Sequence, residues 1–279
     1  MNLNFLPKGI FEQVVKLNLD TLYEIRLRVG YNLKVCSGDD FLVKSLDYKV
    51  KIEDIKEILL NITQHSLYAY NEQIKNGFIT TDEGIRVGIA GRCVVDNDKI
   101  VTIKDISSLN VRIPHRIDGC SDIFFNHIII KDKLLNTLIV SPPFLGKTTM
   151  LKDIARKINL FNQNILIVDE RGEFSIVKGE NIDVLSYSSK EFAFVSGIRA
   201  LSPKIIITDE LSTKSDWECV NSAVNSGITI IASCHAKNIK ELLSKPIFIK
   251  NIFDRYVFLK DGFKAGVLDS IYDKDLNKL

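Results

Sequence analysis

The chain has few of the features that mark several common protein classes. Its five cysteines are an odd number with no CxxC pair, which argues against a disulfide framework and against a zinc ribbon. No apolar run approaches the ~20 residues that a membrane-spanning helix needs, and residues 1–18 lack the basic start and apolar stretch of a signal peptide. The 37 basic and 35 acidic residues leave a net charge of only +2, which argues against a protein that coats DNA. We therefore expect a globular protein of the cytoplasm.

Apolar residues are plentiful, at 46% of the 279 residues, which is enough for one large domain or two modest ones. In the N-terminal part, alternating segments predict half-exposed strands, and apolar residues spaced at a helical period from Ile52 to Ile74 predict a helix or a helix pair. The predicted strands are 24–29, 33–35, 85–90, 92–95, 100–103 and 110–113. We expect a smaller α+β domain over residues 1–125, followed by a second domain over residues 126–279.

The second part alternates apolar strands with segments of helical period. The predicted strands are 138–140, 165–168, 183–185, 205–208 and 228–233, and the predicted helices are 148–158, 190–200 and 216–226. Continuous apolar strands separated by helices predict an α/β domain whose mainly parallel sheet is covered on both faces. Residues 256–259 and 267–271, around Gly262, predict a terminal hairpin.

The sharpest motif follows the first of these strands and opens the first helix. It reads Ser141-Pro142-Pro143-Phe144-Leu145-Gly146-Lys147-Thr148-Thr149, which is typical of a P-loop (Walker A). In such a loop, backbone N–H groups surround a phosphate, Lys147 reaches the β- and γ-phosphates, and the Thr148 hydroxyl serves Mg²⁺. The first glycine of the motif is Ser141 here, and if that position requires a positive φ, serine adds strain on the order of 1 kcal/mol. We predict that this segment binds ATP with Mg²⁺.

Two later strands each end in an Asp-Glu pair, Asp169-Glu170 and Asp209-Glu210. The carboxyl ends of parallel strands meet at one edge of the sheet, where the P-loop also lies. Carboxylates there can hold Mg²⁺ or orient the attacking water, so we predict that Asp169 and Asp209 serve the metal and that Glu170 or Glu210 activates water. His235 ends the next strand at the same edge, where it is either structural or a sensor of the γ-phosphate.

The order of these motifs resembles that of the RecA-like ATPases of type II and type IV secretion and of type IV pili. The resemblance extends from the P-loop to an acidic box at 169–170, a Walker B pair at 209–210 and a histidine box at 235. The chain is similar, more closely, to the stage III sporulation AA family of endospore-forming bacteria. That likeness is carried in both halves of the chain, by residues 24–30, 66–70, 77–80, 86–92, 105–113 and 166–172.

The resemblance implies a P-loop ATPase of the mother-cell cytoplasm, peripheral to a membrane-embedded channel complex between mother cell and forespore. It also implies a hexamer with nucleotide between subunits, and Glu170 as the residue that activates water, with Glu210 as its rival. A phosphoryl-transfer transition state spreads negative charge over its oxygens, so an arginine from a neighbouring subunit accelerates the reaction. Position in the pilus-motor pattern makes Arg86, Arg92 and Arg112 the candidates, and surface charge on strands is their alternative reading.

Two other functions remain open at this point. A nucleic-acid-dependent RecA-fold ATPase would use the N-terminal arginines to bind phosphate backbones, although the sequence carries no strong sign of nucleic-acid binding. A nucleotide-binding scaffold with little hydrolysis is the other, because Ser141 and the short segment between 173 and 183 depart from the family pattern.

Overall fold

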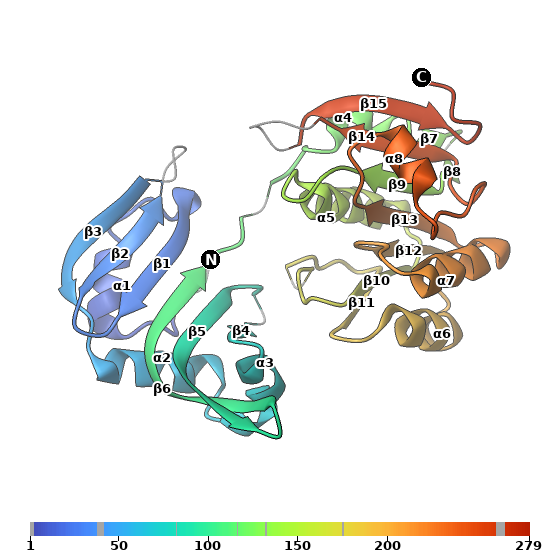
Figure 1. The fold of residues 1–279 in the computed structure, drawn as a ribbon. Coiled ribbons are helices and arrows are strands. Elements are labelled where there is room, and N and C mark those ends of the chain that lie inside the picture. The colour runs from blue at the N-terminus through green and yellow to red at the C-terminus, as the bar shows by residue number, and fades with distance from the viewer. Residues whose placement is uncertain are drawn as a thin grey trace. The chain divides into compact units, whose positions relative to one another are not determined.

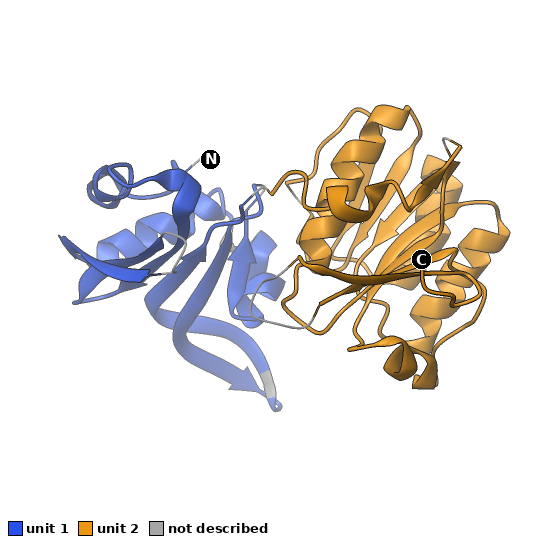
Figure 2. Cartoon of the chain, turned by 90° about the horizontal axis from the view of Figure 1, so that it is seen from above, with its two compact units in different colours: residues 1–115 blue, residues 116–279 orange. Residues whose placement is uncertain are grey.

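The computed structural model describes residues 3–37, 42–81, 83–115, 117–131, 133–174, 176–260 and 266–279. The chain forms two compact units, Met1–His115 and Arg116–Leu279 (Figure 2). Within the described residues, every helix is too short or too polar to cross a membrane.

The first unit is built on a six-stranded antiparallel sheet with the strand order β3-β2-β1-β6-β5-β4 (Figure 1). One face of this sheet is apolar and packs against the helices of the unit, as Ile25 and Leu27 of β1 do. The elements are α1 (Lys8–Val14), η1 (Leu19–Thr21), β1 (Leu22–Arg28), β2 (Asn32–Ser37), β3 (Leu42–Lys49), α2 (Ile52–Ile62), η2 (Leu67–Tyr70), α3 (Asn71–Lys75), β4 (Phe78–Thr80), β5 (Arg86–Asp96) and β6 (Lys99–Arg112).

The strands β5 and β6 are longer than the sequence predicted. The predicted strands 85–90 and 92–95 form one strand, because Gly91 does not interrupt β5 but lies at a bulge between Ala90 and Arg92. The predicted strands 100–103 and 110–113 are likewise parts of one strand, β6. A Cβ atom at Gly91 would lie 2.6 Å from the Lys104 carbonyl oxygen of β6, so the close approach of the two strands requires glycine there. Strand β3 is a further element that the sequence analysis missed.

The second unit is built on a seven-stranded sheet with the order β11-β10-β12-β13-β9-β14-β15. All neighbouring strands are parallel except β14 and β15, which form the predicted hairpin; its turn, with Gly262, lies outside the described residues. The elements are α4 (Asp122–Phe125), β7 (Ile129–Ile130), β8 (Lys133–Leu134), β9 (Thr137–Val140), α5 (Lys147–Ile158), η3 (Asn159–Phe161), β10 (Ile165–Asp169), β11 (Ile182–Ser186), α6 (Lys190–Leu201), β12 (Ile205–Thr208), α7 (Lys214–Asn225), β13 (Thr229–Cys234), α8 (Ile239–Ser244), β14 (Arg255–Leu259) and β15 (Leu268–Asp273).

Both faces of this sheet are buried, which explains the continuous apolar strands. In β9, Leu138 and Val140 pack on the side of α6, α7 and α8, whereas Ile139 packs on the side of α5. Trp217 of α7 is fully buried against the sheet. The prediction of a mixed α/β chain with a mainly parallel second sheet is therefore confirmed.

Residues 117–125 pack on the second unit, although the sequence analysis placed them with the first. Asp153 of α5 accepts hydrogen bonds from the backbone N–H groups of Gly119 (3.0 Å) and Ser121 (2.9 Å). Phe124 of α4 is buried in the same cluster as the apolar face of α5. The segment 117–125 is thus an anchored part of the second unit.

Candidate functional site

The segment 141–146 connects β9, in the interior of the parallel sheet, to the start of α5. The backbone N–H of Ser141 donates to the Cys234 carbonyl (3.3 Å) and so continues the pairing of β9 with β13. The chain then turns through two left-handed residues, Phe144 (φ 64°) and Gly146 (φ 87°). Ser141 does not have a positive φ, so the strain considered for this position is absent. The strand, loop and helix are arranged as the P-loop prediction requires.

Lys147, the first residue of α5, is almost completely buried. Its Nζ atom lies 2.9 Å from the Pro142 carbonyl oxygen, 3.1 Å from the Ser141 carbonyl oxygen and 2.9 Å from His235 Nδ1. Burial lowers the pKa of the Lys147 amine, and the negative charges of Asp209 and Glu210 partly oppose this effect. The amine therefore lies between the start of the loop and the predicted histidine box.

Thr148 and Asp209 are in direct contact. The Thr148 hydroxyl donates a hydrogen bond to Asp209 Oδ2, and Asp209 Oδ1 accepts from the Ser233 hydroxyl and from the backbone N–H of Glu210 (2.8 Å). A hydroxyl beside a fixed carboxylate is an oxygen-donor pair of the type that Mg²⁺ prefers. The two residues therefore fit the metal role predicted for them. Within the described part of the chain, no three His, Cys, Asp or Glu side chains form a metal cluster by themselves.

Asp169 differs from Asp209 in its partners. Its Oδ1 accepts from the backbone N–H of Glu173 (2.8 Å), and its Oδ2 accepts from that of Phe174 (2.9 Å) and from the Ser186 hydroxyl (3.3 Å). Both oxygens thus hold the turn that follows β10, residues 169–174, which we call the acidic loop. These bonds favour a loop-holding role for Asp169 over the predicted metal role.

Three glutamates line a small pocket beside Asp209, together with Arg171, Phe174, Lys190 and Ser212. Glu170 forms an ion pair with Lys190, and Glu210 forms one with Arg171 (2.7 Å). Within the residues that the structure describes, the Glu173 carboxylate has neither a hydrogen bond nor an ion pair. Burial raises the pKa of Glu173, and the nearby charge of Asp209 raises it further. The positive charges of Lys152 and Arg171 oppose this rise without reversing it. Glu173 is therefore the glutamate of this pocket that has a raised pKa and no hydrogen bond or ion pair among the described residues.

His235 lies between the P-loop lysine and the acidic pocket. Its Nδ1 is 2.9 Å from Lys147 Nζ, and its Nε2 is 3.7 Å from Glu210 Oε1. A neutral ring that accepts at Nδ1 from the lysine carries its proton on Nε2, facing the glutamate. The predicted site residues Lys147, Thr148, Asp209, Glu210 and His235 are thus brought together at the carboxyl ends of β9, β12 and β13.

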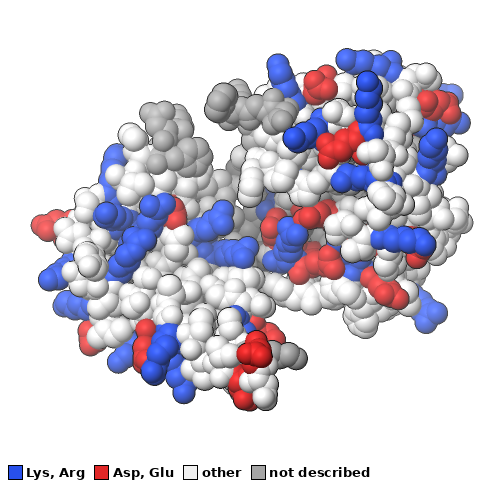
Figure 3. Space-filling model, viewed as in Figure 1, with Lys and Arg blue, Asp and Glu red and all other residues white. Residues whose placement is uncertain are grey.

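The three predicted arginines all lie in the first unit. Arg86 of β5 is directly opposite Arg112 of β6 in the strand register, so these two share one face of the sheet, the face not covered by helices. The Arg86 guanidinium lies 3.8 Å from the centre of the Phe78 ring. Arg92 lies beyond the bulge and pairs with exposed Asp105 (2.9 Å). Figure 3 shows further basic side chains on the visible face of this unit.

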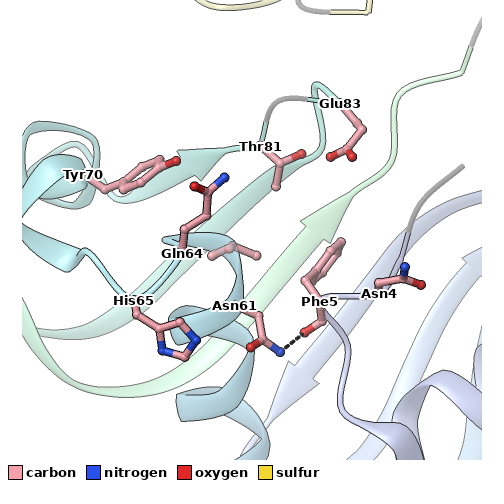
Figure 4. Close-up of a pocket in the computed structure, with 9 residues that line it drawn as sticks. Asn4, Phe5, Asn61, Gln64, His65, Tyr70, Thr81 and Glu83 are labelled. Carbon is pink, nitrogen blue, oxygen red and sulfur yellow. Dashed lines mark hydrogen bonds between the residues drawn. The ribbon is translucent and has the colours of Figure 1, made fainter.

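A second pocket is lined by residues of the first unit, and none of the predicted site residues is among them (Figure 4). Its lining is rich in amides, and Asn61 Nδ2 donates to the Phe5 carbonyl (3.1 Å). The lining residues are Asn4, Phe5, Asn61, Ile62, Gln64, His65, Tyr70, Thr81 and Glu83.

The residues of the acidic pocket that were not predicted from the sequence include Glu173 and Lys190. Glu173 lies three positions after Glu170 within Asp-Glu-Arg-Gly-Glu, and a second glutamate in so short a loop was a signal for it. Lys190 gave no signal, because a lysine at a helix start looks like an ordinary surface residue.

Comparisons with known proteins bear on the family and on the fold. The chain is 34% identical over 273 residues to the stage III sporulation protein AA of Bacillus subtilis (strain 168), covering 92% of this chain and 88% of that protein. Its fold is similar to that of the Legionella pneumophila ATPase DotB (TM-score 0.62, 12% identity, 98% of this chain and 79% of that chain). It is equally similar to the pilus retraction motor PilT solved with bound ADP (TM-score 0.62, 16% identity, 90% of this chain and 77% of that chain). The sequence model described as "Sporulation stage III, protein AA" matches residues 6–279, and the chain therefore belongs to that family.

Proposed function

We propose that the chain is an ATP-binding and ATP-hydrolysing motor of the secretion-ATPase type that works during endospore formation. The observation that carries this proposal is the meeting of Lys147, Thr148, Asp209 and an acidic pocket at one edge of a parallel sheet. Membership of the sporulation family supports the process, and the fold shared with DotB and PilT supports the motor class. The motor would energise or assemble the channel complex between mother cell and forespore, from the cytoplasmic side of the membrane.

In this proposal, the loop 141–149 holds the phosphates of ATP. Backbone N–H groups at the start of α5 point toward the phosphates, and Lys147 pairs with the β- and γ-phosphates. Thr148 and Asp209 hold Mg²⁺, which offsets the negative charge of the phosphoryl oxygens when it is bound. His235, which lies between Lys147 and Glu210, senses the γ-phosphate in this proposal.

We assign water activation to Glu173. A general base needs an accessible lone pair and a pKa raised toward neutrality. Glu170 and Glu210, which the sequence suggested for this role, each have a cation on the carboxylate. The pKa of Glu173 is raised by burial, and its oxygens are unoccupied within the described chain. Glu170 and Glu210 then act as charge partners of the pocket.

We further propose a homohexamer in which arginines of one copy complete the site of the next. Arg86 and Arg112 suit this role because they lie together on the uncovered face of their sheet. Arg92 is less suited, because its guanidinium pairs with Asp105.

Two variants test the function. Saturating ATP, at ~100 times its dissociation constant, should stabilise the wild type by ~2.7 kcal/mol, a rise of several degrees in Tm. Lys147→Ala should lose this rise and all turnover. Glu173→Gln should keep the rise, while kcat falls by about 10²–10⁴-fold.

Other outcomes select a rival. A Tm rise without turnover of the wild type would favour the scaffold with little hydrolysis. Turnover that depends on DNA or RNA, and that weakens steeply with salt, would favour the nucleic-acid motor. If Glu173→Gln hydrolyses ATP normally and Glu170→Gln does not, Glu170 is the general base and Glu173 is not.

A further inference from the structure

The segment 186–190, from the last residue of β11 to the first of α6, contacts the acidic loop at several points. The Tyr187 N–H donates to the Asp169 carbonyl (2.9 Å), and the Ser186 hydroxyl donates to the Asp169 carboxylate (3.3 Å). The Tyr187 side chain covers Gly172, which has a φ of 69° and where a Cβ atom would lie 2.2 Å from the Tyr187 hydroxyl oxygen. The last contact is the ion pair of Lys190 with Glu170. The acidic loop is thus fixed from outside as well as by its own hydrogen bonds.

Lys190 occupies an unusual position for a lysine. Its side chain is only 5% exposed, and it is the first residue of α6, where the helix dipole disfavours a positive charge. A buried ammonium group is stable only with a partner, and Lys190 Nζ has the Glu170 carboxylate. Lys214 is also the first residue of a helix, α7, but its side chain is 78% exposed. The burial of Lys190 is therefore set by Glu170 and the pocket, not by its place in the helix.

We propose that Lys190 is a positioning residue that holds the acidic loop, through Glu170, in the arrangement that Glu173 needs to orient water. This inference rests on the proposed function. Asp169 fixes the backbone of Glu173 from within the loop, and Lys190 fixes the neighbouring Glu170 to α6 from outside. Without the ammonium group, the Glu170 carboxylate is left unpaired in a pocket that it shares with Glu173, Asp209 and Glu210. Repulsion among these carboxylates then displaces the loop.

The first test compares Lys190→Met with wild type in steady-state turnover of Mg²⁺-ATP. We expect kcat to fall by at least about 10-fold, because a small misplacement of reacting groups is costly. KM should stay within about twofold, because Lys190 lies outside the loop 141–149. Lys190→Arg, which keeps the charge, should recover most of kcat. The matched control is Lys214→Met, which removes an exposed lysine from the same helix position and should change neither value.

The second test asks whether Lys190 and Glu170 act as a unit. The double variant Lys190→Met/Glu170→Gln should be no worse than Lys190→Met alone, because the charge that loses its partner is also removed. A kcat for Lys190→Met equal to wild type, or losses that simply multiply in the double variant, would overturn the proposal.

Hydrogen exchange of the amides of residues 170–174 gives a readout that needs no turnover. Lys190→Met should speed exchange of this segment at least several-fold, while residues 147–158 of α5 keep their wild-type rates. Unchanged exchange at 170–174 would overturn the inference even if turnover fell. Faster exchange in a chain whose wild type does not hydrolyse ATP would reject the proposed function and leave the contact itself established.

Discussion

At the scale of single residues, Ser141 occupies the position where the P-loop pattern has glycine. Its side chain is fully buried, its hydroxyl donates to the Pro142 carbonyl (2.8 Å), and the same hydroxyl oxygen lies 3.2 Å from Lys147 Nζ. Serine is tolerated because the left-handed turns of this loop lie at Phe144 and Gly146. The departure from the motif adds a polar contact to the lysine and no strain to the backbone.

The first prediction is that Ser141→Gly destabilises the chain. Glycine adds backbone freedom to the unfolded chain and removes the buried hydroxyl, so the free energy of unfolding should fall by about 1 kcal/mol. The midpoint of urea unfolding of the nucleotide-free chain measures this change. A higher midpoint for Ser141→Gly would mean that the serine is strained after all.

The residues of the P-loop, the two Asp-Glu pairs and His235 were predictable from sequence, because motif spacing and strand ends determine where they lie. The partners of the acidic side chains were not. Whether Glu170 or Glu173 carries a free carboxylate depends on Lys190, which lies at the start of a helix in another part of the chain. Such pairing is set by tertiary packing, and periodicity contains no information about it.

At the scale of elements, α5 connects the P-loop to the first residues of the second unit. Lys147 and Thr148 begin this helix, while Asp153, in its middle, binds Gly119 and Ser121. The burial of Asp153 raises its pKa, but hydrogen bonds from the Ser121 hydroxyl, the backbone N–H groups and Lys157 outweigh that effect and lower the pKa from 3.8 to about 2. The ionised Asp153 therefore stabilises the anchored segment.

The second prediction concerns acid. Because the pKa of Asp153 is depressed in the folded state, its contribution is fully present above the unfolded value of 3.8 and is lost as the pH falls toward about 2. Asp153→Asn should lose ~2 kcal/mol of unfolding free energy at neutral pH. The loss relative to wild type should shrink between pH 4 and pH 2, as followed by urea unfolding at each pH. Asp122→Asn, which removes an exposed partner of Lys157, is the control and should cost little. A difference that stays constant across this pH range would assign the effect of Asp153→Asn to packing and not to charge.

Helices and strands, like single residues, were predictable where the sequence pattern determines them and not where tertiary contacts do. Strands β9, β10, β12 and β13 were found because burial on both faces makes them continuously apolar. Strand β5 was divided into two, because Gly91 is typical of a break in a strand and is instead a site of close strand approach. Strand β3 was missed because its side chains are mostly exposed and give no apolar alternation.

At the scale of the whole molecule, the candidate arginines and the P-loop belong to different compact units. If a neighbouring copy supplies the arginines, turnover per chain should rise steeply with protein concentration, because dilution separates the copies. Flat specific activity over a wide concentration range would indicate a site that one chain completes alone.

The last prediction assigns the arginines by mixing variants. Lys147→Ala keeps the arginines but has a P-loop that cannot bind ATP. Arg86→Ala/Arg112→Ala keeps the P-loop but lacks the two candidate arginines. Each should be inactive alone. An equal mixture should recover activity at about a quarter of the sites, those where an intact P-loop meets a neighbouring copy with intact arginines. Arg92→Ala should be active without being mixed with a second variant, because Arg92 is paired with Asp105 in its own hairpin. If each variant is inactive alone and the mixture also stays inactive, while each variant still forms the wild-type assembly, the arginines act within their own chain, and the shared-site motor must be abandoned in favour of a self-contained one.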